Sequence, residues 1–170
     1  TVYDIDTLTG NTTQYIYGVK NAHTLYATEV DNQISLWIPD FQSNTLTNIT
    51  RGVTQNVASD LQGPWGITPL DSSAFLVTSL QGNTVISVTT DGEVTELIRN
   101  LKSPTGIAHN EGYIYVANTG SARRAIEWFS LSAVANNEEA FDDENAATEH
   151  TLVSGLQNVT NITLAADNYL

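Results

Sequence analysis

The chain has 170 residues, of which 41% are hydrophobic, and this is the size and apolar content of about one folded domain. Its formal net charge is −13, from 6 Lys and Arg against 19 Asp and Glu, so binding to nucleic acid is not expected. The absence of cysteine excludes disulfides and thiolate metal sites. Its apolar runs are too short to cross a bilayer, so membrane insertion is not expected either.

The first part of the chain predicts short strands. Residues 1–14 hold two β-prone runs around the polar turn Thr9-Gly10-Asn11, which is typical of a closing hairpin. Residues 15–60 contain four further runs, at 15–19, 24–28, 34–38 and 45–49, and these predict one four-stranded unit. Uncharged Thr, Asn, Ser and Gln dominate the polar residues, which favours strands and turns over helices.

An internal repeat follows this unit. Residues 61–68 read LQGPWGIT and residues 101–108 read LKSPTGIA, so both share the pattern L-x-x-P-x-G-I. Residues 156–163 keep the Leu and the Ile of the pattern and have Asn161 at the glycine position, where Asn tolerates positive φ. Each complete copy precedes β-branched and aromatic runs separated by polar turns such as Asp91-Gly92. Four short strands in about forty residues, repeated, predict the blades of a β-propeller.

The predicted organisation is an all-β propeller with four-stranded blades at 15–60, 61–100 and 101–155, a partial blade at 1–14, and the start of a further blade at 156–170. Three arrangements stay open for the incomplete blades. They join each other and close a four-bladed ring, they pair with another copy or another chain, or the 170 residues are a segment of a larger propeller. We favour the segment, because it also accounts for a sequence without methionine.

The blade at 101–155 carries an insertion at 133–149. Six acidic residues lie between Glu138 and Glu149. We expect a solvated loop, since insertions in repeat proteins usually map to loops on one face. The alternative is a partner-docking loop or a calcium site with Asp142, Asp143 and Glu144 as candidate ligands, and Ca²⁺ is the only cofactor that the sequence brings into consideration.

With these motifs, residues 15–170 resemble the NHL-repeat propellers and their relatives, the SMP-30/gluconolactonase-like and streptogramin-lyase-like proteins. The resemblance implies that Gly66 and Gly106 let the innermost strands crowd near the ring axis. In the metal-dependent lactonase relatives a divalent cation lies in the central channel. Only Asn118 resembles a channel-facing polar residue of that kind, so the full ligand set cannot be placed on this chain.

Two side chains are candidates for a site in the channel. His109 is the first candidate for a general base, because imidazole titrates near neutral pH, although an ordinary role at the turn that follows is the simpler interpretation. Trp65 stands beside the glycine of an inner strand, where its ring would either stack on a ligand or pack between blades. The sequence therefore predicts at most a weak catalytic set.

Four N-x-[ST] sequons, at Asn11, Asn48, Asn158 and Asn161, favour a secreted or cell-surface protein, or a periplasmic one in a bacterium. Our first functional hypothesis is a non-catalytic extracellular propeller module that binds other protein chains, glycans or copies of itself. The alternative is a metal-dependent lactonase, hydrolase or lyase with its site in the central channel of a complete propeller.

Overall fold

A computed structural model describes residues 1–19, 21–120, 124–136, 139–143 and 149–165. Short strands dominate it, and the described part contains one short helix. The elements are β1 (Val2–Ile5), β2 (Thr12–Ile16), β3 (Tyr26–Val30), β4 (Gln33–Asp40), β5 (Thr45–Thr50), β6 (Val53–Ala58), β7 (Pro64–Pro69), β8 (Ala74–Ser79), β9 (Thr84–Thr89), β10 (Val94–Arg99), β11 (Pro104–Asn110), β12 (Tyr113–Asn118), β13 (Ala125–Ser130), α1 (Leu131–Ala135), β14 (Phe141–Asp142) and β15 (Thr151–Ser154).

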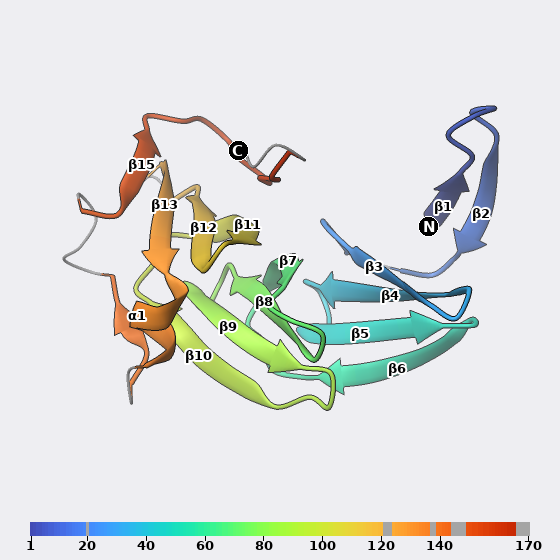
Figure 1. Ribbon diagram of the computed structural model, residues 1–170, viewed down its shortest axis with the longest axis horizontal. Coiled ribbons are helices and arrows are strands. Elements are labelled where there is room, and N and C mark those ends of the chain that lie inside the picture. Colours follow the sequence, from blue (N-terminus) through green and yellow to red (C-terminus); the bar gives the residue numbers. More distant parts are fainter. Residues whose placement is uncertain (20, 121–123, 137–138, 144–148, 166–170) are drawn as a thin grey trace.

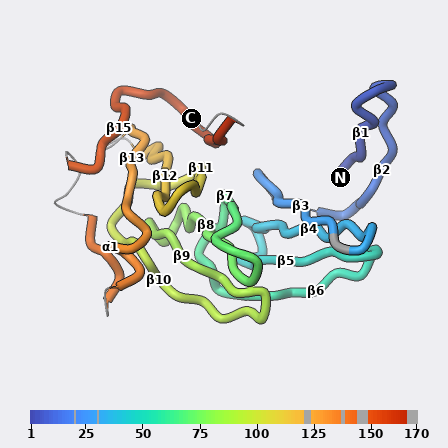
Figure 2. The backbone as a smooth tube through the Cα atoms, viewed as in Figure 1, coloured from blue at the N-terminus to red at the C-terminus, as the bar shows by residue number. Residues whose placement is uncertain are grey.

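The strands form separate sheets that follow one another along the chain. Blade 1 is β3-β4-β5-β6, blade 2 is β7-β8-β9-β10 with β14 added outside β10, and blade 3 is β11-β12-β13-β15. Strands β1 and β2 form a two-stranded sheet, the N-terminal hairpin. The sheets fan out in an arc, with β3, β7 and β11 on its inner side (Figures 1 and 2). This arrangement confirms the expected all-β propeller architecture of four-stranded blades.

Blade 1 differs from the expected strand assignment. Tyr15 and Ile16 belong to β2 and pair with β1, so blade 1 begins at β3 and ends with β6. The sequence did not reveal β6 because most of its side chains are exposed and polar, with the sequence VTQNVA. A strand whose two faces are both largely solvated carries no hydrophobic alternation by which to recognise it.

The core lies between the blades. Successive side chains of a strand point to opposite faces of its sheet, so each blade contributes one face to each neighbour. On β8, Phe75 packs toward blade 1, with its ring 4.6 Å from that of Trp37 and 5.8 Å from that of Tyr26. Leu76, the next residue, is buried in a cluster with Ile107 and Ile114 of blade 3. Burial between sheets therefore fixes the angle at which successive blades meet. In the described residues, no helix has the length and apolarity needed to span a membrane.

Candidate functional site at the centre of the arc

The L-x-x-P-x-G-I pattern marks the same place in each blade. Pro64 and Pro104 each form the first pair of their inner hairpin, and a β-bulge follows both. In blade 1 an isolated bridge between Ala22 and the end of β4 occupies the equivalent place, so residues 23–25 take the positions of residues 65–67. The sequence did not reveal this copy because it keeps neither the proline nor the glycine.

Threonine hydroxyls join each repeat to the next near the centre of the arc, from the inner segments of blades 1 and 3 and, in blade 2, from Thr78 on β8. Thr24 Oγ1 donates to the carbonyl of Trp65 at 2.6 Å, and Thr78 Oγ1 donates to the carbonyl of Thr105 at 2.7 Å. Thr105 Oγ1 in turn donates to the carbonyl of Val159 at 2.9 Å. Each bond satisfies a carbonyl on the inner edge of a sheet and contributes about 1 kcal/mol. The bonds therefore hold the inner strands of the repeats at a fixed spacing around the centre.

Two glycines allow this close approach. A Cβ atom added to Gly66 would lie 2.3 Å from the carbonyl oxygen of Thr105, and one added to Gly106 would lie 2.5 Å from the backbone nitrogen of Ile162. Both contacts are with backbone atoms of the next repeat, which cannot move aside as a flexible side chain could. The two glycines therefore allow the inner strands of successive repeats to approach each other closely, as the resemblance implies.

The inner segments of four repeats line an open recess of about 330 Å³. Its lining comes from residues 24–26, 67–69, 107–109 and 161–164, which are equivalent stretches of the successive repeats. An aliphatic residue recurs at one position of each stretch, as Leu25, Ile67, Ile107 and Ile162. The positions after it include the hydroxyl-bearing Thr68 and Thr163 and the imidazole of His109. The volume is at the lower end of the range for small-molecule sites, but the recess is open on one side and its lining is more polar than is usual for such sites.

His109 is the titratable group of β11 that faces this recess. It pairs with Ile114 in the β11–β12 ladder, just before the turn at Glu111 and Gly112, both of which have positive φ. Its Nε2 atom is buried and makes no hydrogen bond within the described residues. A buried imidazole nitrogen without a partner is costly, and a small shift of the His109 ring would be needed for a ligand in the recess to reach it.

Trp65 has a different setting from the one expected for a ligand-stacking ring. Its indole stacks on His23 with ring centroids 3.4 Å apart and planes within 4°, and the ring of Phe41 lies beside both at nearly a right angle, 6.0 Å from His23 and 5.8 Å from Trp65. Its Nε1 donates to the carbonyl of Thr160, two blades further along, at 3.1 Å. One face of the indole is therefore covered, and the side chain ties the first, second and fourth repeats together. Burial lowers the pKa of His23 from its ordinary value.

Asn118 is not among the residues that line the recess. It lies at the end of β12, 1% exposed, where its Oδ1 accepts from the backbone N–H of Lys102 at 3.0 Å. Its Nδ2 donates to the buried carboxylate of Glu127 on β13. The channel-facing role suggested by the resemblance is wrong for this arrangement, because both polar ends of the amide are used inside the blade.

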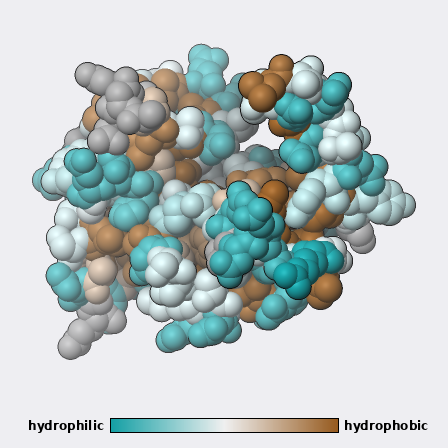
Figure 3. Space-filling model, turned by 45° about the vertical axis from the view of Figure 1, so that its right-hand side comes forward, coloured by the Kyte–Doolittle hydropathy of each residue, from teal (hydrophilic) through white to brown (hydrophobic). Residues whose placement is uncertain are grey.

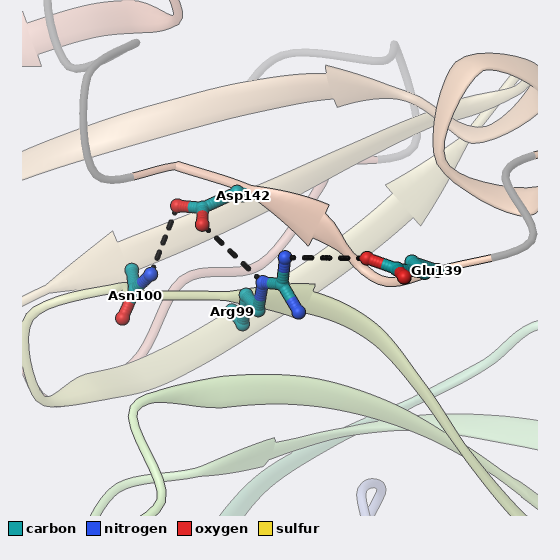
Figure 4. Close-up of polar contacts among 4 residues, drawn as sticks. All are labelled: Arg99, Asn100, Glu139 and Asp142. Atoms are coloured by element: carbon teal, nitrogen blue, oxygen red, sulfur yellow. Dashed lines mark hydrogen bonds and ion pairs between the residues drawn. The ribbon is translucent and has the colours of Figure 1, made fainter.

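The acidic insertion of blade 3 reaches back to blade 2. Strand β14 runs parallel to β10, and Asp142 accepts from Arg99 Nε at 3.3 Å and from Asn100 Nδ2 at 2.9 Å (Figure 4). Arg99 Nη2 lies 3.7 Å from the carboxylate of Glu139. The insertion thus covers the outer edge of a sheet, which would otherwise expose its backbone groups. The simple solvated loop that we expected is wrong for residues 139–143.

The contacts of Asp142 and Asp143 are relevant to the predicted calcium site, because these residues were candidate ligands. Asp142 directs both carboxylate oxygens at the edge of blade 2, and the backbone N–H of the buried Asp143 donates to the carbonyl of Arg99 at 3.0 Å. Glu144 lies outside the described residues. Across the parts of the chain that the structure describes, no three His, Asp or Glu residues are grouped so as to hold a metal ion. The calcium site stays a prediction without support from these residues.

The sequons differ in accessibility. Asn11 is exposed in the turn between β1 and β2, and Asn158 is exposed before the fourth repeat. Asn161 is also exposed but lies against Gly106 at the recess. Asn48 lies within β5, where its Nδ2 donates to the carbonyl of Leu36 at 3.4 Å. Glycosylation stays a prediction, and the geometry favours the first two sites.

Comparison with known proteins supports the assignment of the fold. No protein-family model matches the chain, and no curated protein is similar enough in sequence to be a relative. A catalytically inactive variant of virginiamycin B lyase from Staphylococcus aureus, solved with quinupristin, is 21% identical, with a TM-score of 0.56 over 76% of this chain and 45% of the lyase chain. A streptogramin B lyase structure is also 21% identical, with a TM-score of 0.58 over 94% of this chain and 50% of the other.

The chain therefore spans about half the length of the solved structures that it matches. The likeness to streptogramin lyases supports that part of the expected resemblance at the level of fold, and the NHL-repeat assignment stays a prediction. At this identity the comparison establishes architecture alone. Together with the repeated four-stranded sheets and their inner threonine contacts, it shows that the chain has the fold of a β-propeller.

Proposed function

We propose that this chain is part of an extracellular β-propeller that binds a ligand in its central recess without transforming it. The ligand is a small organic molecule or one unit of a larger one, such as a sugar residue of a glycan. The extracellular setting rests on the sequons. The observation that carries the proposal is the convergence of four equivalent inner segments on one recess of about 330 Å³.

The lining suggests the chemistry of the ligand. The lining includes the isoleucines of the inner segments, of which Ile67 and Ile107 are almost fully buried against the preceding blades, while Thr68 and His109 add hydrogen-bonding groups. A sugar ring presents both an apolar face and hydroxyl groups, so it can satisfy both kinds of surface at once. The buried Nε2 of His109 would gain the partner that it lacks among the described residues.

Binding is favoured over catalysis by what surrounds His109. General acid–base and nucleophilic mechanisms need a second group that orients the base or supplies the other proton. The lining of the recess offers Tyr26 as a further titratable side chain and contains no carboxylate among the described residues. A lone imidazole can donate or accept a hydrogen bond, but it forms no catalytic pair here.

A lyase or hydrolase acting in the same recess is the second candidate, with His109 as the base. It is favoured by the unpaired Nε2 atom and by the fold shared with the streptogramin lyases, one of which is catalytically inactive as a histidine-to-alanine variant. Incubation with quinupristin, followed by mass spectrometry, tests it. Turnover that disappears in His109→Ala would favour the enzyme over the binding module.

A thermal-shift screen of sugars and small cyclic compounds tests the binding proposal. A ligand at about 100 times its Kd adds about 2.7 kcal/mol to the free energy of unfolding, which is readily seen as a rise in Tm. We expect His109→Ala to lose most of that rise and Val53→Ala, at an exposed position on β6, to keep it. A screen without hits, or hits equally strong in His109→Ala, would contradict the proposal.

A further inference from the structure

Strand β14 occupies the outer side of the junction between blades 2 and 3. It runs parallel to the end of β10, with Asp142 opposite Arg99, and the backbone N–H of Asp143 donates to the carbonyl of Arg99 at 3.0 Å. Phe141 packs on the core of that junction, while the carboxylate of Asp142 contacts Arg99 and Asn100 (Figure 4). An extended segment with one apolar and one charged side chain therefore fits beside the last strand of a blade.

The junction between blades 1 and 2 has the same backbone conformation. In both links the leucine of the L-x-x-P-x-G-I pattern donates its backbone N–H to an asparagine carbonyl in a turn of the preceding blade, at 3.1 Å for Leu61 and at 3.0 Å in the next link. The residues just before these leucines, Asp60 and Asn100, have φ of 62° and 63°. Ser59 and Asp60 therefore stand where Arg99 and Asn100 stand one blade later.

The end of β6 has an open recess in this place. Strand β6 is the last of its sheet in the described part of the chain, whereas β10 has β14 beside it. A recess of about 290 Å³ lies between residues 59–62 and blade 2, and we call it the outer groove. Its blade 2 wall consists of Ser79, Gly82, Thr84, Ile86, Val94 and Glu96. Figure 3 shows hydrophobic side chains among hydrophilic ones along the lower edge of the view, where β6 and β10 lie in Figure 1, so this edge offers both kinds of contact.

Charge distinguishes the outer groove from the place that β14 fills. Where β14 meets the guanidinium of Arg99, the outer groove has Ser59, and the exposed Asp60 follows it. The carboxylate of Glu96 lies on the opposite wall, and no Lys or Arg lines the groove among the described residues. Opposite charges across an interface fix its register and exclude wrong partners. The charge that suits this groove is therefore positive, the reverse of the charge that Asp142 brings to Arg99.

Thr84 is a separate indication of a ligand in the outer groove. It is 8% exposed, it lines the groove, and its hydroxyl makes no hydrogen bond to the residues that the structure describes. Its cross-strand neighbour Ser79 is already used, because that hydroxyl donates to the carbonyls of Leu61 and Gln62 at 2.6 and 2.8 Å. Buried polar groups are normally hydrogen-bonded. The Thr84 hydroxyl is therefore available to a group that enters the groove.

We propose that the outer groove binds an extended, basic segment of a partner protein. The segment runs parallel to the end of β6, as β14 runs beside β10, and its backbone pairs with that of Ser59. One apolar side chain covers Val94, which is 43% exposed. A neighbouring Arg or Lys contacts Asp60 and Glu96. This is β-strand addition, in which main-chain hydrogen bonds give affinity and side-chain contacts give specificity. With 6 basic residues against 19 acidic ones, a second copy of this chain is a poor source of such a segment.

Binding of a designed peptide to the full chain tests the proposal. The probe is the capped peptide Lys-Ala-Phe-Arg-Lys, which keeps the Ala-Phe pair of residues 140–141 and reverses the charges around it. The control peptide, Glu-Ala-Phe-Asp-Asp, has the sequence of residues 139–143. Each is added in millimolar excess to the ¹⁵N-labelled full chain. We expect saturable amide shifts at residues 58–62 and at Glu96 with the basic peptide, and binding of the control peptide that is about tenfold weaker or more.

One substitution at two exposed turns separates specific binding from general attraction. Asp60→Asn removes the charge and keeps a residue that takes left-handed φ, as Asn100 does in the equivalent link. Asp31→Asn makes the same change at φ 52° in the turn between β3 and β4. We expect the affinity for the basic peptide to fall about three- to fivefold in Asp60→Asn, as for loss of an exposed ion pair, and to stay unchanged in Asp31→Asn. Circular dichroism shows whether Asp60→Asn is folded, and Glu96→Gln is the second variant if it is not.

Three outcomes would overturn the proposal. The first is no amide shift in residues 58–62 at the highest concentration of the basic peptide. The second is equal binding by the Asp60→Asn and Asp31→Asn variants, because the peptide would then follow the net charge of the chain alone. The third is a dimer in light scattering that Asp60→Asn abolishes, because a second copy would then occupy the groove.

Discussion

At Gly66 and Gly106 the backbones of successive repeats come so close that a single carbon atom decides whether the blades fit. Both glycines were recognisable from their place in the repeat, because sequence spacing reports directly on backbone geometry. Asn118 could not be placed in the same way. Its polar character is equally compatible with a channel wall and with the buried contacts that it makes to Lys102 and Glu127.

Gly66→Ala should destabilise the chain by about 1 to 3 kcal/mol, because its Cβ would lie 2.3 Å from a carbonyl oxygen of the next blade. Urea unfolding measures the difference. Thr54→Ala, at an exposed position on β6, should change the free energy of unfolding by less than about 0.5 kcal/mol. Equal effects of the two substitutions would mean that the blades do not approach so closely.

His23 should make stability depend on pH. Partial desolvation holds the pKa of this largely exposed side chain below its ordinary value, so the unfolded chain binds a proton more readily than the folded one, by a small margin that solvent screening reduces further. Stability from this group is present above about pH 6.5 and is lost as the pH falls below it. The wild-type chain should therefore lose more stability between pH 7.5 and 5.5 than His23→Phe, which keeps an aromatic ring on Trp65. Parallel pH profiles for the two proteins would show that His23 is not responsible.

At the scale of elements, the insertion shows what sequence reasoning misses. Its acidic composition predicted solvation, since charge runs are usually exposed. The structure instead adds β14 to the edge of blade 2, where Glu139 and Asp142 contact Arg99, Asp142 also contacts Asn100, and Phe141 packs on Phe129. A two-residue strand has no periodicity, and its partner lies 43 residues earlier, so only the folded chain brings the two together.

We expect Phe141 to contribute more than the ion pairs do to the attachment of residues 139–143 to blade 2. The Arg99 side chain is 40% exposed and its partners are 83% and 44% exposed, so Arg99→Ala should cost less than about 1 kcal/mol and lose its effect in high salt. Phe141→Ala removes a large apolar side chain that packs against the core, and should cost about 2 kcal/mol or more. Chemical denaturation at 0.05 and 1 M NaCl separates the two effects. A larger, salt-sensitive loss in Arg99→Ala would reverse this ranking.

At the scale of the whole molecule, the repeat predicted the class of fold because the two complete copies, at 61–68 and 101–108, combine the same turn, strand and glycine signals. The first copy was harder to recognise. Residues 21–25 keep the position of the pattern without its proline or glycine, and only the bridge from Ala22 to Asp40 reveals the equivalence. The central recess could not be predicted as a unit for the same reason, since one of its four sides comes from that degenerate copy.

Our central proposal is that the recess lined by equivalent segments of four repeats at the centre of the arc is a ligand site. Chemical-shift mapping of ¹⁵N-labelled protein with the strongest compound from the thermal-shift screen tests it most directly. We expect the largest amide shifts in residues 24–26, 67–69, 107–109 and 161–164 together, with His109 among them. Shifts confined to the outer strands, or to one repeat alone, would contradict it.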